Sequence, residues 1–242
     1  MISQFFKIVI AVCSFIYLFL SIFELTYFLS FPRTDLRNNK DDPRLETSWV
    51  LLKDMMLLSI FVIQHSVMAT NKFKTIVNKF GLSDLSRCLY SIATAHTLLF
   101  IVKHWLISDI LVWKFSINYK SLYWCYFGVH CAAWIIIYVA NICTDVTELF
   151  GLKQVYYSLI NLPDPNNRKS YKLRMLTTHM RHPSFLGFLI IFWFYPDMTL
   201  DRLLLSSILT LYMYFAWNTD GEDYDYQKYM YQRKYYELQR LR

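Results

Sequence analysis

A short basic segment at the edge of an apolar run carries the clearest chemical signal in this sequence of 242 residues. The segment HMRHP contains His179, Arg181 and His182, and Pro183 stands where a helix can begin, because the first N–H groups of a helix have no intrahelical partner. Cationic donors at the mouth of a membrane helix suit an anionic group held at the bilayer surface. The alternative is that Arg181 and His182 only extend to lipid headgroups.

Two further features of this segment limit its chemistry. Gly187, one helical turn after Pro183, allows a backbone or a ligand to approach closely. His179 and His182 share a helix face at a spacing of three, but no carboxylate or cysteine completes a metal site with them. We therefore expect a polar or anion-binding site here and no metal centre.

Long apolar runs must position these residues. Apolar residues make up 55% of the chain and the mean hydropathy is +0.26, which excludes an ordinary soluble domain. Residues 1–242 are expected to form a single integral-membrane domain, an all-α polytopic transmembrane helical bundle. The six predicted spans are 5–31, 49–69, 88–112, 121–142, 184–199 and 201–218. The tail YQKYMYQRKYYELQRLR predicts a short, basic, Tyr-rich helix on the membrane surface.

The distribution of positive charge predicts the orientation of these spans. With six spans, 16 Lys and Arg residues lie on the side that holds both termini, against seven on the other side. The positive-inside rule places both termini and the HMRHP loop on the cytoplasmic or nucleoplasmic side. The net charge of +7 is thus a topology signal, and no nucleic-acid partner is expected.

Polar residues recur at the depth of the HMRHP loop. Gln64 and His65 interrupt the apolar segment VIQHSVMA, Arg87 begins the third span and Glu222 follows the sixth. Because polar side chains near lipid are costly, we expect one shared pocket at this face. Its predicted members are Gln64, His65, Arg87, Arg181, His182 and Glu222. The alternative is that membrane interfaces are polar everywhere.

Other polar residues favour structural roles. Lys53–Asp54 and Lys103 lie toward the opposite face, where an interhelical ion pair is predicted. His96 and His130, near mid-membrane, are expected to be hydrogen-bonded packing residues. The five cysteines show no paired spacing and are expected to be small packing residues.

Five segments in this order resemble the nurim family of inner-nuclear-membrane proteins: FVIQHSVMA, LSRCLYSIATAHTLLF, TELFGLKQVYYSL, MRHPSFLGFL and DRLLLSSILTLYM. That family is similar to a wider group containing isoprenylcysteine carboxyl methyltransferases, methanethiol S-methyltransferases and bacterial NnrU-like proteins. The resemblance implies a location in the inner nuclear membrane, with the endoplasmic reticulum as the alternative. It also implies the lipid bilayer, and nuclear-envelope proteins, as partners.

The wider resemblance implies S-adenosylmethionine as a cofactor. Arg181 and His182 would meet its carboxylate or nearby polar groups, with Gly187 beside them and Glu222 as the acidic partner. The chain departs from the methyltransferases after the sixth span, because NTDGEDYDY lacks their two consecutive glutamates and the tail lacks their proline motif. These departures favour a structural or interaction role in the nuclear envelope. The alternative is an S-adenosylmethionine-dependent S-methyltransferase acting on a thiol or thiolate at the membrane face.

Overall fold

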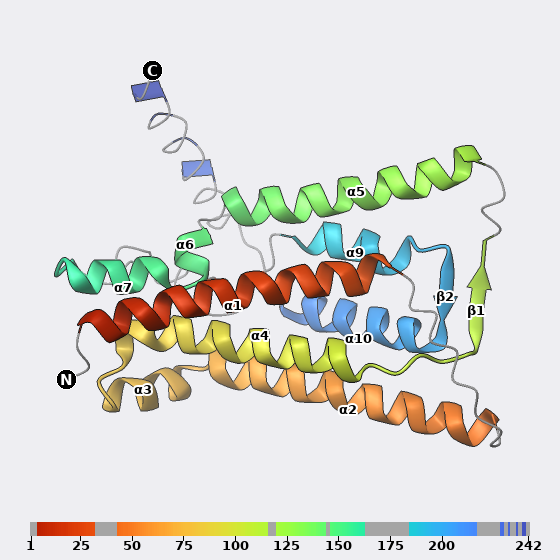
Figure 1. The fold of residues 1–242 in the computed structure, drawn as a ribbon, viewed down its shortest axis with the longest axis horizontal. Coiled ribbons are helices and arrows are strands. Elements are labelled where there is room, and N and C mark those ends of the chain that lie inside the picture. Colours follow the sequence, from red (N-terminus) through yellow and green to blue (C-terminus); the bar gives the residue numbers. More distant parts are fainter. Residues whose placement is uncertain are drawn as a thin grey trace.

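Helices dominate the computed structural model, which describes residues 4–31, 43–115, 120–143, 146–162 and 184–216, with isolated positions between 228 and 240. Figure 1 shows the long helices side by side along the longest axis. They are α1 (Gln4–Ser30), α2 (Pro43–Ala69), α4 (Ser86–His104), α5 (Lys120–Cys143) and α10 (Leu200–Ala216), and the nine-residue α9 (Phe185–Trp193) packs among them. The all-α helical bundle predicted from the apolar runs is confirmed.

Short elements join these helices at the two ends of the bundle. The shorter helices are α3 (Asn71–Lys79), the 3₁₀ turn η1 (Ser83–Leu85), α6 (Val146–Leu149) and α7 (Leu152–Leu159). They lie at the end that holds the N-terminus (Figure 1). At the other end, β1 (Leu111–Lys114) pairs antiparallel with β2 (Asp197–Thr199).

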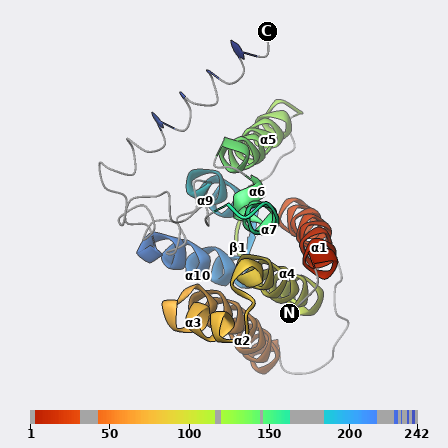
Figure 2. The ribbon, with the colours of Figure 1, turned by 90° about the vertical axis from the view of Figure 1, so that its left-hand side faces the viewer.

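The helices pack in an order that differs from their order in the chain. α1 contacts α4, α4 contacts α2, α2 contacts α10, α10 contacts α9, and α9 contacts α5. Seen along the bundle in Figure 2, α9 and α10 lie between α5 on one side and α2 with α4 on the other. The main core is formed where these helices meet and includes Leu58, Ala133 and Ile191, each fully buried.

Small side chains bring α1 and α4 together. Ser14 and Ser21 of α1 are buried, and their hydroxyls donate to the backbone carbonyls of Cys88 and Ala95 of α4, both at 3.2 Å. Small residues let helix backbones approach closely in a membrane, where van der Waals packing and interhelical hydrogen bonds drive association. Cys88, which is fully buried and free, is one of these packing residues.

Four helices among the described residues are long and apolar enough to cross a membrane: 4–30, 47–69, 83–104 and 120–142. α9, with nine residues, is about 14 Å long, and α10, with 17 residues, about 26 Å, against roughly 30 Å of bilayer hydrocarbon. The count of six spans therefore stays a prediction.

Two helices end earlier than the predicted spans. α4 ends at His104, well before residue 112, and α9 ends at Trp193, before residue 199. Beyond these ends the chain forms β1 and β2, and Pro196 between α9 and β2 cannot continue a helical hydrogen-bond ladder. The apolar runs thus extend past the helices into the small sheet.

Candidate functional site

The His65 imidazole is enclosed by aromatic rings. Its exposed fraction is 5%, and it stacks on Phe61 and Tyr90 with ring centroids 5.1 Å away in each case. Tyr212 of α10 meets it edge-on at 6.2 Å. His65 therefore points into the bundle, where α2, α4 and α10 meet.

Hydroxyl groups of α4 lie within hydrogen-bond distance of the imidazole nitrogens. The Tyr90 hydroxyl lies 2.9 Å from Nδ1 and 3.0 Å from Nε2, and the Thr94 hydroxyl lies 3.2 Å from Nδ1. Gln64, the preceding residue, makes an equivalent contact, because its Oε1 accepts from the Thr97 hydroxyl at 3.0 Å. Gln64 and His65 thus both join α2 to α4.

Arg87 lies on the same side of α4 and extends this polar group toward α6. Its guanidinium carbon is 5.0 Å from the centroid of the Tyr90 ring, and its Nε donates to the Leu149 carbonyl at 2.8 Å. The chain after α6 approaches the backbone of α4 closely at Gly151, which has a φ of +92°. A Cβ at this position would lie 2.8 Å from the Cys88 backbone nitrogen. Only glycine fits this conformation and this space.

The structure thus brings Gln64, His65 and Arg87 together through one face of α4. The hydroxyl residues Tyr90, Thr94 and Thr97, which link them, are absent from the residues predicted from sequence. They follow Arg87 at spacings of three or four, which is the repeat of one helix face, so this spacing could have revealed them.

Gly187 lies elsewhere. It is buried against α5, and a Cβ there would stand 2.5 Å from Ile137 Cγ1 and 2.8 Å from the Ala133 carbonyl oxygen. The close approach expected at Gly187 is therefore made to the backbone of α5. Arg181, His182 and Glu222 lie outside the described residues, so their place in a shared pocket stays a prediction.

A second group of charged residues is buried at the opposite end of the bundle. Asp201 accepts from Trp105 Nε1 and from the Ser108 N–H, both at 3.0 Å, and Asp54 accepts from the Leu106 N–H at 3.1 Å. Because the N–H groups of Leu106 and Ser108 donate to these carboxylates and not to helix carbonyls, α4 ends at His104. Among the described residues the Oδ2 atom of Asp54 has no hydrogen-bond partner.

The predicted ion pair between Asp54 and Lys103 does not form. Lys53 and Lys103 are exposed, whereas Asp54 is fully buried and faces the backbone of residues 105–108. Arg202, a partly buried cation at this end, stacks 3.4 Å from the centroid of the Tyr195 ring and donates to the Leu29 carbonyl at 2.9 Å. A long cation can extend toward water, and a short carboxylate held by N–H groups cannot.

The two histidines predicted to lie near mid-membrane have hydrogen-bonding roles. His130 Nε2 lies 3.0 Å from the Ser30 hydroxyl, which also accepts from Trp134 Nε1 at 2.9 Å. His96 Nδ1 lies 3.2 Å from the Tyr17 hydroxyl. Both connect α1 to a neighbouring helix.

The contacts of His65 predict a measurable but modest contribution to stability. His65→Phe keeps the stacking on Phe61 and Tyr90 and removes a partner from two hydroxyls. Such hydrogen bonds in membrane helices contribute about 0.6–1.7 kcal/mol, so the variant should unfold at a lower temperature in detergent, measured by tryptophan fluorescence. His96→Phe, at an exposed position, is the control and should cost less. Equal losses in both variants would contradict a special role for His65.

The known proteins to which this chain is similar include several with the same name. The chain is 37% identical over 240 residues to a protein named Nurim homolog from Drosophila pseudoobscura pseudoobscura, covering 94% of each chain. It is 35% identical over 193 residues to Nurim from Mus musculus, covering 77% of this chain and 72% of that one. No family model matches the chain, and no solved structure matches it.

Proposed function

Because this chain belongs to the nurim family, we propose that it is a multi-pass protein of the inner nuclear membrane with a structural or interaction role in the nuclear envelope. The similarity to Nurim homolog over 94% of both chains carries this proposal, since it includes the loops and short helices as well as the apolar spans.

The surface of the long helices supports the membrane environment. Large apolar side chains face outward along the whole length of α1, α2 and α5, for example Phe23 at 66%, Ile63 at 62% and Ile135 at 61% exposure. Exposed apolar area of this extent is characteristic of a lipid-facing surface. Some polar residues of these helices are buried, among them Ser14, Ser21 and His65.

Selective permeabilisation of cells tests the location. A C-terminal epitope tag in the inner nuclear membrane faces the nucleoplasm under the predicted topology. An antibody should then fail to stain after digitonin, which opens only the plasma membrane, and should stain the nuclear rim after Triton X-100. A reticular signal already present after digitonin would place the protein in the endoplasmic reticulum and overturn the proposal.

The predicted topology has its own test. The ratio of 16 to seven Lys and Arg residues predicts that both termini face the cytoplasm or nucleoplasm. A glycosylation acceptor fused to either end should therefore remain unmodified in a gel-shift assay with endoglycosidase. A matched acceptor inserted within residues 32–42, between the first two predicted spans, should be glycosylated. Modification of a terminal tag would overturn this topology.

The described residues do not fit an S-adenosylmethionine cradle. The space beside Gly187 is filled by Ile137 and Ala133, the His65 ring is covered by Phe61 and Tyr90, and Arg87 donates to a backbone carbonyl. These side chains hold helices together, and we derive no catalytic step through them. This packing supports a structural role for Gly187, His65 and Arg87.

Calorimetry separates the structural or interaction role from the methyltransferase alternative. Titration of S-adenosylmethionine into the detergent-purified protein is expected to give no binding heat at millimolar concentration. Saturable binding that Arg181→Ala abolishes would instead favour the methyltransferase. Lys169→Ala, in the preceding loop, is the charge-matched control for that variant.

A further inference from the structure

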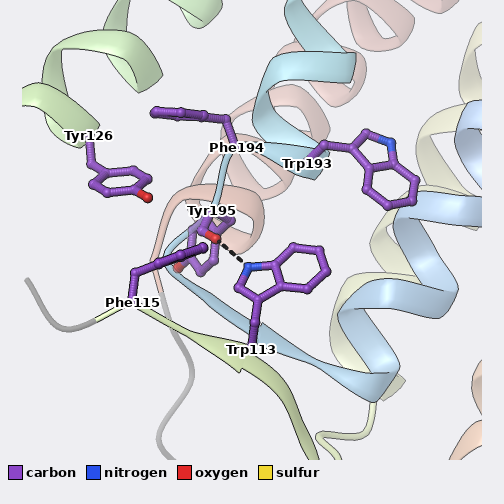
Figure 3. Close-up of a pocket in the computed structure, with 6 residues that line it drawn as sticks. All are labelled: Trp113, Phe115, Tyr126, Trp193, Phe194 and Tyr195. Carbon is purple, nitrogen blue, oxygen red and sulfur yellow. Dashed lines mark hydrogen bonds between the residues drawn. The ribbon is translucent and has the colours of Figure 1, made fainter.

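An aromatic cavity lies at the end of the bundle that carries β1 and β2. Its volume is about 410 Å³, and it is open to the outside. The lining residues, which Figure 3 shows around the cavity, are Trp113, Phe115, Tyr126, Trp193, Phe194 and Tyr195. Aromatic residues make up 19% of the chain, yet all six lining residues are aromatic.

The hydrogen-bonding groups of the two tryptophans are already used. Trp113 Nε1 donates to the Tyr195 carbonyl at 3.1 Å (Figure 3), and Trp193 Nε1 donates to the Thr210 hydroxyl at 3.0 Å. Tyr126 and Phe194 stack with ring centroids 4.7 Å apart. The cavity therefore offers ring surfaces and few hydrogen-bonding groups to a ligand.

Ring surfaces with few acceptors favour one class of cation. The face of an aromatic ring carries a negative quadrupole and attracts cations, and cages of several rings bind quaternary ammonium groups. A primary ammonium has three N–H donors to satisfy, and the side chains of this lining offer it two acceptors, the hydroxyls of Tyr126 and Tyr195. An anionic headgroup needs several donors, and the same two hydroxyls are the side-chain O–H donors of the lining. A trimethylammonium group carries positive charge and needs neither.

The position of the cavity indicates where such a group comes from. Trp and Tyr are enriched where a membrane protein passes through the lipid headgroups. The cavity is bounded by the end of α9, by β1 and by the first turns of α5, which is the level at which the long helices end. Arg202, on the Tyr195 ring, has the adjacent Asp201 carboxylate to balance its charge.

We propose that this cavity binds the choline headgroup of a phosphatidylcholine molecule in the leaflet next to β1 and β2. The trimethylammonium group occupies the space between the rings, and the acyl chains extend along the apolar surface of α5. This site lies at the opposite end of the bundle from His65 and Arg87 and does not depend on the role of those residues.

Native mass spectrometry of the full-length, delipidated protein tests the proposal. The probes are dihexanoyl phosphatidylcholine and dihexanoyl phosphatidylethanolamine, which share acyl chains and differ in the headgroup methyls. Phosphatidylcholine should bind about tenfold more tightly, a gain within the range of cation–π contacts. Tetramethylammonium, which has neither phosphate nor acyl chains, should displace it.

Leucine variants locate the bound lipid. Phe115→Leu with Tyr126→Leu keeps the cavity apolar and removes two ring surfaces, so phosphatidylcholine binding should fall about tenfold. Phe127→Leu, at an exposed position next to Tyr126 and outside the cavity, is the control and should bind normally. Should the double variant fail to fold, Phe115→Leu alone serves, because Phe115 is 53% exposed.

Two results would overturn the proposal. Equal binding of the two lipids, without displacement by tetramethylammonium, would identify an acyl-chain groove. A preference for phosphatidylcholine that survives in the folded leucine variants would place the choline site elsewhere.

Discussion

Asp201→Ala is expected to destabilise the protein by about 3–5 kcal/mol, the range seen when one partner of a buried charged group is removed. The carboxylate is 4% exposed and accepts from Trp105 Nε1 and the Ser108 N–H. Alanine leaves both donors buried without an acceptor and removes the negative charge beside Arg202. The midpoint of thermal unfolding in detergent, followed by tryptophan fluorescence, measures the loss.

A neighbouring aspartate provides the control. Asp109 is exposed in the same connection between α4 and β1, so Asp109→Ala should unfold close to the wild-type temperature. Asp201→Asn should fall between the two, because an amide keeps one acceptor oxygen and presents an N–H₂ group where the second acceptor stood. If Asp201→Ala and Asp109→Ala unfold together, the carboxylate does not hold the end of α4.

The helical spans could be predicted from the sequence, because an apolar run that crosses a bilayer must satisfy its backbone hydrogen bonds internally and therefore forms a helix. α1 at 4–30 and α5 at 120–143 agree with the runs at 5–31 and 121–142. The end of α4 could not be predicted in this way. Its apolar run continues, and the helix stops because Asp54 and Asp201, from α2 and α10, accept the N–H groups of Leu106 and Ser108.

The same distinction applies to the candidate site. Gln64 and His65 were identifiable because polar residues interrupt an apolar segment. The spacing of their partners places those residues on one face of α4, but only the position of α2 beside that face shows which hydroxyl meets Gln64 and which meets His65. The interhelical ion pair predicted between Asp54 and Lys103 was wrong, because Asp54 is buried and accepts from the Leu106 N–H whereas Lys103 is exposed.

The surroundings of Gly187 distinguish most directly between a role in helix packing and a role in binding a cofactor. The spacing of Gly187 from the RHP segment predicts a close approach, but a sequence cannot say whether the neighbour is a helix or a ligand. In the structure the neighbour is α5, with the Ala133 carbonyl oxygen 2.8 Å from where a Cβ would stand. A backbone oxygen cannot move aside as a side chain can, so α9 and α5 must separate to admit even a methyl group.

Gly187→Ala is therefore expected to destabilise the protein by about 1–3 kcal/mol, the usual cost of overpacking a close contact. Gly128→Ala is the matched control, because Gly128 lies on α5 with no atom within 4 Å of its added methyl, and alanine there should stabilise the helix by about 0.5–1 kcal/mol. The two substitutions add the same methyl group and are expected to shift the unfolding temperature in opposite directions. A Gly187→Ala protein as stable as the wild type would contradict the packing role and would favour the prediction that a ligand lies beside this glycine.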